Sequence, residues 1–404
     1  MATNKMEGDY TGRAIPLFLI ALTTGLLTVL TLGIYRFWAK ARIRRYVWSS
    51  TAPGGDPFEY TGTGLEKFLG FLIAVVVIAV YLGVIQIGLM LFGFSALAIL
   101  NDEPVTMTEI AIQIAFPYLT LLALSPMIFF AQYRGRRYLM SRTRWRGIRF
   151  GMDKAAFGYV WRGVATLLAT ILTLGLLWPL MTWTLERYKT ERTRYGDRHF
   201  SQDGSWYELY GPFKHVLIGA LILIGGPVAM GLAGLPTLGG IIGGVGGIWL
   251  SVGLVLYRVR GFGLMMRYRT LEGGIRFDCQ PSGGLVILYQ ILGRVFVVAA
   301  FVATMVPFVL FLAPQLASLD PAEIETAIFA LGGSLFVLYA GAVVAIAVAM
   351  AVYTSFVAQP VFAHYVHATT ILGAEKLDYV RQGSADDIAD AEGFADALDV
   401  GGAF

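Results

Sequence analysis

The chain alternates between long apolar runs and short polar segments over its 404 residues. A helix that crosses the apolar core of a bilayer needs about 20 consecutive, mostly apolar residues. Six runs reach that length and are predicted to be full transmembrane helices: 68–99, 110–132, 214–235, 238–257, 284–312 and 324–358. The pattern therefore predicts an all-α polytopic membrane protein.

Charge divides the polar segments between these runs into two classes. Lys and Arg concentrate in four of them: 36–67, 133–155, 185–214 and 257–283. The segments 101–109 and 313–325 carry acidic residues and no basic residue, and 235–237 carries no charge. Because Lys and Arg accumulate in cytoplasmic loops, we expect the basic segments and both termini to be cytoplasmic.

Two further apolar runs, 14–35 and 156–184, do not fit simple crossings. Run 156–184 separates two basic segments, so a full crossing would leave one of them outside. We therefore predict a re-entrant or interfacial pair of short helices that breaks at Thr173–Gly175, where glycine lowers helix propensity by about 1 kcal/mol. The string LTLG at this break recurs at 30–33, which predicts the same for 14–35. Eight plain transmembrane helices are the alternative.

An internal repeat marks the basic segments: a Tyr, a Thr five residues later, and a Phe seven residues after that. Three copies are regular, namely Tyr46/Thr51/Phe58, Tyr138/Thr143/Phe150 and Tyr188/Thr193/Phe200. Looser copies are Thr270/Phe277, with Met265 in the Tyr place, and Tyr365/Thr370/Leu377. The pattern predicts a helix end, a turn and a short strand. Isolated hairpins are marginally stable, so we expect these strands to pair with one another in a small cytoplasmic sheet.

The order of long and short runs predicts three repeated parts and a tail. The first repeat covers 1–132 and the second 133–257, each with one short dip and one helix pair. A third helix pair covers 258–383 without a dip. The tail, 384–404, is acidic and rich in Gly and Ala, which is typical of a disordered segment.

Composition agrees with a membrane location and limits the chemistry. Only 14% of the residues are charged, against roughly a quarter in soluble domains, and the mean hydropathy is +0.66. The single cysteine, Cys279, excludes an intrachain disulfide and a multi-cysteine metal site. His364 and His367 share a helix face, but no carboxylate or thiol near them in the sequence completes a metal site. We expect no cofactor, no metal and no enzymatic activity.

Arginines near the membrane ends are the main candidates for binding. Each juxtamembrane cation contributes about 1 kcal/mol of attraction to an anionic leaflet, so we expect anionic lipid headgroups as partners and no nucleic acid. The candidates are Arg36, Arg42, Arg44, Arg45, Arg134, Arg136 and Arg137. Arg162 and Arg294 lie inside apolar runs, where ionisable groups are functional candidates, although both could snorkel to the headgroups.

The stretch LTLGIYRFWAKARIRRY, followed by FEYTG at 58–62, resembles the YjgN family, also called DUF898. The resemblance is close over about the first 70 residues and looser to about residue 380. It implies a bacterial inner-membrane protein. The family has no established activity, so the resemblance transfers no functional residue to this chain.

Two functions remain open from the sequence. The first is a membrane protein that binds or transports a small or lipid-like ligand, which a polar cavity lined by Gln86, Gln290 and Arg294 would favour. The second is a scaffold or assembly factor that docks a still unknown protein partner through its cytoplasmic sheet and acidic tail. A sheet edge exposed near Phe58, Phe150, Phe200 and Phe277 would favour the second.

Overall fold

The computed structural model describes residues 5–91, 107–317 and 324–383. Its six long helices are α3 (Gly64–Leu91), α4 (Met107–Ser141), α7 (Tyr210–Leu232), α8 (Pro236–Arg267), α9 (Gly283–Ala317) and α10 (Ile324–Tyr353). All six are long and apolar enough to cross a membrane, as the sequence predicts. A short π-helical turn and helix α11 (Gln359–His367) continue α10. The predicted tail 384–404 and most of the predicted loop 101–109 lie outside the described residues.

A pair of shorter helices begins at each run that is predicted to double back; the second helix lies in the following basic segment in the first pair and extends into it in the second. Helix α1 (Ala14–Leu30) is followed by α2 (Arg36–Ser49), and α5 (Ala156–Leu172) by α6 (Trp178–Glu191). Members of each pair pack against each other. Both breaks fall on the LTLG string, where Gly33 and Gly175 adopt φ values of 91° and 90°. Such values suit glycine because it has no Cβ. The predicted break is confirmed, and the depth of these pairs in a bilayer stays a prediction.

Nine short strands form one antiparallel sheet in the order β1-β9-β8-β7-β6-β5-β4-β3-β2. The strands are β1 (Lys5–Glu7), β2 (Phe58–Tyr60), β3 (Thr143–Trp145), β4 (Ile148–Met152), β5 (Thr193–Tyr195), β6 (Arg198–Gln202), β7 (Arg269–Leu271), β8 (Ile275–Cys279) and β9 (Thr369–Leu372). The repeated strands therefore pair with one another, as expected. The fold is thus mostly helical, with the short repeated strands that the sequence predicts gathered in one sheet.

The sheet curls so far that its two edges approach each other. Between the edges, the amide N–H of Ala52 donates to the carbonyl of Asp9, and that of Phe58 donates to the carbonyl of Thr51, both at 2.9 Å. A single β-bridge joins Tyr10 and Thr51. The segment around Thr51 thus connects the β1 side to β2 and nearly closes the sheet into a ring.

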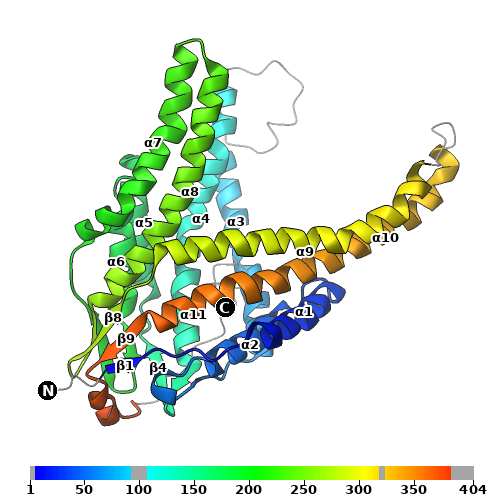
Figure 1. Ribbon diagram of the computed structural model, residues 1–404. Helices are drawn as coiled ribbons and strands as arrows, with labels where there is room; N and C mark the ends of the chain where they lie inside the picture. The colour runs from blue at the N-terminus through cyan, green and yellow to red at the C-terminus, as the bar shows by residue number, and fades with distance from the viewer. Residues whose placement is uncertain (1–4, 92–106, 318–323, 384–404) are drawn as a thin grey trace.

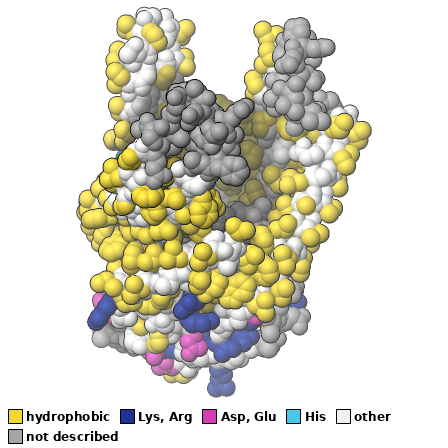
Figure 2. Space-filling model, turned by 90° about the vertical axis from the view of Figure 1, so that its right-hand side faces the viewer, with side chains coloured by type: hydrophobic (Ala, Val, Ile, Leu, Met, Phe, Trp, Pro, Cys, Tyr) yellow, Lys and Arg dark blue, Asp and Glu magenta, His cyan; other side chains and the backbone are white. Residues whose placement is uncertain are grey.

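Five helical hairpins of the described residues stand on this sheet, four connecting neighbouring strands and the first connecting its two edge strands, β1 and β2. They are α1/α2, α3/α4, α5/α6, α7/α8 and α9/α10–α11. In Figure 1, α3, α4, α7 and α8 leave the sheet together, while α9 and α10 leave it in a different direction. Figure 2 shows charged side chains at the sheet end and apolar ones over the helices. A single hairpin is thus a smaller structural unit than each of the three parts predicted from the sequence. The boundaries of those three parts stay a prediction.

The strand register explains the repeated Phe. Each lies opposite a large apolar residue of the next strand: Phe58 opposite Trp145, Phe150 opposite Tyr195, Phe200 opposite Leu271, and Phe277 opposite Ile371. The repeated Thr ends the helix before the strand. The Thr51, Thr143 and Thr193 hydroxyls each donate to the carbonyl four residues earlier at 2.8–2.9 Å.

In the two looser copies of the repeat, the structure places the Thr position one residue earlier than the sequence predicts. Arg269, not Thr270, occupies the Thr place, because three residues (272–274) connect β7 and β8 where two residues connect β3 to β4 and β5 to β6. In the last copy the place belongs to Thr369, not Thr370, because the Thr369 hydroxyl donates to the Tyr365 carbonyl at 2.8 Å. Fixed spacing in the sequence conceals such one-residue changes.

The repeated Tyr fastens the two ends of a helical hairpin together. The Tyr46 hydroxyl donates to the carbonyl of Arg13, which precedes α1, and the Tyr188 hydroxyl donates to that of Ala155, which precedes α5, both at 2.9 Å. Tyr138 donates to the Glu66 carboxylate in the first turn of α3 at 2.8 Å.

Candidate functional site

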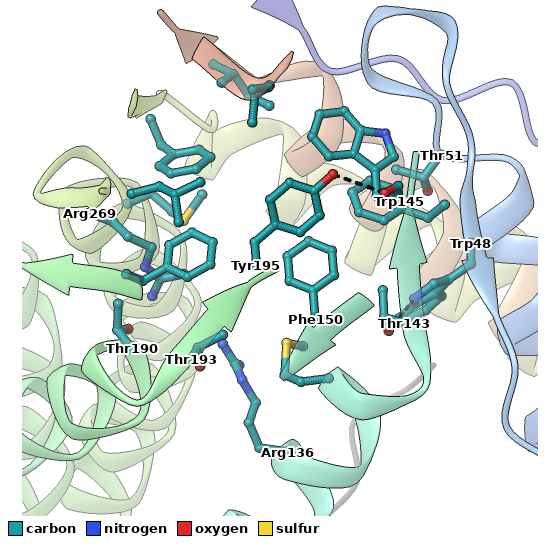
Figure 3. A pocket seen from close by; sticks show the side chains of 18 of the residues that line it. Trp48, Thr51, Arg136, Thr143, Trp145, Phe150, Thr190, Thr193, Tyr195 and Arg269 are labelled. Carbon is teal, nitrogen blue, oxygen red and sulfur yellow. Dashed lines mark hydrogen bonds between the residues drawn. The ribbon is translucent and has the colours of Figure 1, made fainter. Parts of the chain in front are cut away.

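A cavity of about 340 Å³ lies between the curled sheet and the helix ends that return to it (Figure 3). Every helical hairpin contributes to it from its second half, through Trp48 of α2, Met140 of α4, Thr190 of α6, Met266 of α8 and Phe362 of α11. The strands contribute the remaining wall. The cavity is therefore formed by all the repeated hairpins together, and no single hairpin encloses it.

The sheet side of the cavity is largely aromatic. Phe58 stacks on Trp145 with ring centroids 5.5 Å apart, and Phe150 lies 4.7 Å from Tyr195. Figure 3 shows Tyr195 and Phe150 side by side in the lining. Phe200 and Phe277 continue the wall. Alternation along each strand places these side chains on one face of the sheet, and the same face forms a hydrophobic core.

Most polar groups in this wall already have partners. The Tyr195 hydroxyl donates to the Trp145 carbonyl at 3.0 Å, and the Trp48 indole N–H donates to the Thr143 hydroxyl at 3.1 Å. Burial raises the pKa of Tyr195 to about 12, so its hydroxyl is neutral at physiological pH. These groups keep the wall in place and leave it neutral.

Two arginines supply the charge of the cavity. Arg136 of α4 and Arg269 of β7 are the charged residues among the described side chains that line it. Figure 3 shows Arg136 extending toward Thr193, and Arg269 reaching toward Thr190. The strands and helices thus provide a cationic region beside an apolar wall.

A carboxylate behind the lining joins the two arginines. Glu186 of α6 lies 3.0 Å from Arg269 Nη2, 3.8 Å from Arg136 Nη2 and 2.8 Å from Lys189 Nζ. Burial alone would raise the pKa of the Glu186 carboxyl, but Lys189, Arg136 and Arg269 together lower it well below its usual range. Glu186 is therefore ionised at physiological pH.

The structure separates the other predicted arginines from this cavity. Arg44 is buried under the Tyr60 ring, with its guanidinium 5.9 Å from the ring centroid, and Arg137 Nε donates to the Met152 carbonyl at 3.0 Å. Arg134 and Arg36 lie over Phe130 and Phe37. The Arg42 and Arg45 side chains are exposed.

The two arginines that lie inside apolar runs are also away from the cavity. Arg162 is exposed and donates to the Gly158 carbonyl at 3.1 Å, and Arg294 is exposed on α9. Gln86 and Gln290, which were expected to line a polar cavity with Arg294, do not contribute to this one. The described cavity is thus apolar and aromatic where the ligand hypothesis expected a polar one.

Sequence reasoning missed Arg269 and Glu186. A signal for Glu186 exists: it lies seven residues before Thr193, as Arg136 lies seven before Thr143 and Arg44 seven before Thr51. In the first three hairpins, the position two helical turns before the repeated Thr in the sequence thus carries an ionisable residue. Arg269 gave no such signal, because the looser fourth copy was read one residue out of register.

These features define a helical membrane protein with six candidate transmembrane helices and, at one end, a cavity covered by the sheet. The chain belongs to the family of bacterial proteins of unknown function called DUF898, whose profile matches residues 5–396. It is 28% identical to the inner membrane protein YjgN of Salmonella typhimurium over 144 residues, which cover 36% of this chain and 30% of the relative.

The inner membrane protein YjgN of Escherichia coli strain K12 is 30% identical over 159 residues, which cover 39% of this chain and 33% of the relative. The matched stretch therefore spans about a third of the length of these relatives. No protein of known structure matches the chain. Family and relatives agree with an inner-membrane protein.

Proposed function

We propose that this protein binds or moves a small or lipid-like ligand, without acting as an enzyme, and that the cavity is its binding site. The cavity itself carries the proposal. Its volume of about 340 Å³ falls in the range of small-molecule sites, about 300–1,000 Å³, which are mostly apolar and aromatic with a few polar groups. The lining of this cavity has that composition.

Support also comes from where the cavity lies. Its walls come from all five helical hairpins, so a ligand there contacts every repeat at once. The basic residues at the sheet end are consistent with a cytoplasmic location of the sheet and of both termini. A ligand in the cavity would then lie at the cytoplasmic membrane surface, where lipid-like molecules are available.

The scaffold hypothesis has weaker support. It expected Phe58, Phe150, Phe200 and Phe277 near an exposed sheet edge, and these side chains line the cavity instead. The acidic tail at 384–404, its second proposed docking element, lies outside the described residues. A protein partner is a separate proposal, which pull-down experiments test.

A cavity-filling substitution tests the binding proposal. Ile371 lines the cavity, whereas the neighbouring Thr370 lies on the other face of the same strand. The probe is radiolabelled dodecanol, with the protein in nanodiscs of phosphatidylcholine and empty nanodiscs as the blank. We expect saturable binding to the wild type and to Thr370→Trp, and loss of binding in Ile371→Trp. Binding that survives in a folded Ile371→Trp protein would contradict the proposal.

A further inference from the structure

The charged cluster beside the cavity is not electrically balanced. Arg136, Arg269 and Lys189 carry three positive charges around the single carboxylate of Glu186, which leaves an excess of two. The described residues place no second carboxylate in this cluster. The four side chains are partly buried, with 14–31% of their surface exposed, and partly buried charge costs free energy unless it is paired.

Hydrogen bonding at the two lining arginines is also incomplete. The Nε atoms of both Arg136 and Arg269 are buried and have no hydrogen-bond partner among the described residues. Guanidinium groups bind carboxylates and phosphates through pairs of parallel N–H donors. Each arginine thus keeps a donor that its contact with Glu186 does not use.

The unsatisfied charge and the apolar wall belong to the same cavity. The aromatic residues of the sheet form one part of its lining, and Arg136 and Arg269 form another. A neutral apolar ligand would leave the arginine donors unpaired, and a small inorganic anion would leave the aromatic wall empty. Only a molecule with both an apolar body and an anionic group satisfies both parts.

We infer that the ligand of this cavity is an anionic amphiphile, whose carboxylate or phosphate binds Arg136 and Arg269 and whose apolar body packs on the aromatic wall. This inference rests on the proposed function and adds the chemical class of the ligand. A free fatty acid and an acidic phospholipid share this chemistry. Glu186 holds the two arginines in position and competes with the anion for them.

A matched pair of probes separates the inference from the function beneath it. Dodecanoate and dodecanol have the same chain length and differ in charge. We measure their equilibrium binding to the protein in phosphatidylcholine nanodiscs, at a pH where the carboxylic acid is ionised. A charge-assisted hydrogen bond strengthens binding by roughly ten- to hundredfold, so we expect dodecanoate to bind about tenfold or more tightly than dodecanol.

Three variants assign that preference to the cluster. Arg136→Gln and Arg269→Gln should each lower the affinity for dodecanoate about tenfold and thereby reduce its preference over dodecanol. Arg267→Gln is the matched control, because Arg267 is exposed and lies outside the lining. Glu186→Gln removes the competing carboxylate and should strengthen dodecanoate binding, whereas a purely structural cluster predicts no gain. Arg269→Lys keeps the charge and covers the case in which a Gln variant does not fold.

The outcomes are distinct. If neither probe binds, the proposed function fails and the inference fails with it. If both probes bind the wild type equally, the function stands and the inference is wrong. The same holds if the Arg136→Gln and Arg269→Gln proteins prefer dodecanoate as strongly as the wild type does. Competition by inorganic phosphate as effective as that by dodecanoate would show that the apolar body is irrelevant and would also overturn it. Competition by phosphatidylglycerol in the nanodisc would identify a phospholipid source, and its absence a free acid.

Discussion

The hydroxyl of Tyr188 donates a hydrogen bond to the carbonyl of Ala155 at 2.9 Å, and this contact joins the end of α6 to the beginning of α5. Tyr46 makes the same contact with Arg13 in the first hairpin. The repeated Tyr therefore has a structural role that its position in the motif does not reveal. It closes the base of a helical hairpin where the hairpin meets the sheet.

We expect Tyr188→Phe to lower the free energy of unfolding by about 1 kcal/mol, the usual contribution of one hydrogen bond. The ring packing with Tyr133 and Tyr159 is retained in this variant. The measurement is reversible unfolding in mixed detergent micelles. Tyr379→Phe is the control, because the Tyr379 side chain is exposed, and it should change little. Equal effects of the two substitutions would argue against the role of the contact.

The break between α5 and α6 depends on backbone conformation at Gly175. Its φ of 90° is unfavourable for a residue with a Cβ, and a Cβ built there meets no atom within 4 Å. Gly175→Ala should therefore destabilise the protein by about 1–2 kcal/mol through the backbone alone. Gly240 of α8 also has free space around it but an ordinary helical φ. Gly240→Ala should be neutral or stabilising in the same unfolding assay.

Stability should depend on pH through Glu186. Its neighbours lower the pKa of the folded carboxyl well below the unfolded value, so folding favours the ionised form. The contribution is present above the unfolded pKa of about 4.3 and is lost as pH falls below it toward the folded pKa.

At neutral pH, Glu186→Gln should lower the free energy of unfolding by roughly 1–3 kcal/mol, because it leaves partly buried cations without their carboxylate partner. The difference from the wild type should shrink only in acid, which unfolding measured from neutral to acidic pH can follow. A difference that stays constant across that range would show that the Glu186 charge is not responsible.

The common side of the sheet can be tested by cysteine labelling. The single native cysteine, Cys279, is buried, so background labelling should be low. Glu59 of β2 and Arg276 of β8 are exposed and belong to different helical hairpins. Single cysteines introduced at both positions should react with an impermeant maleimide only after the inner membrane is opened. Labelling of the two positions from opposite faces would contradict the shared location of the strands.

Much of the helical framework could be predicted from the sequence. Apolar length predicted the six long helices, and the LTLG string located both breaks at Gly33 and Gly175, because each depends on local chemistry. The repeat with fixed spacing predicted one strand around each Phe, and β2, β4, β6 and β8 contain these residues. Strand β1 and the strands that precede the turns, β3, β5 and β7, were not predicted. The predicted features are encoded within a few residues of where they occur.

The cavity could not be predicted in the same way. The pair Glu186–Arg269 joins a helix of one hairpin to a strand that follows another, and nothing in local spacing indicates such a contact. The turn at 272–274 is one residue longer than its counterparts, which removed Arg269 from the pattern. The curl of the sheet, which encloses the cavity, results from pairing between strands of all the hairpins.

The pairing of β1 with β9 has a consequence for biogenesis. Lys5 lies opposite Leu372, so β1 cannot pair with β9 until all the helices between these two strands have been synthesised. Helical hairpins can enter the membrane one after another during translation, but the ring of strands closes after the last of them. A nascent chain that is released early therefore exposes unpaired strand edges, which can pair with other chains.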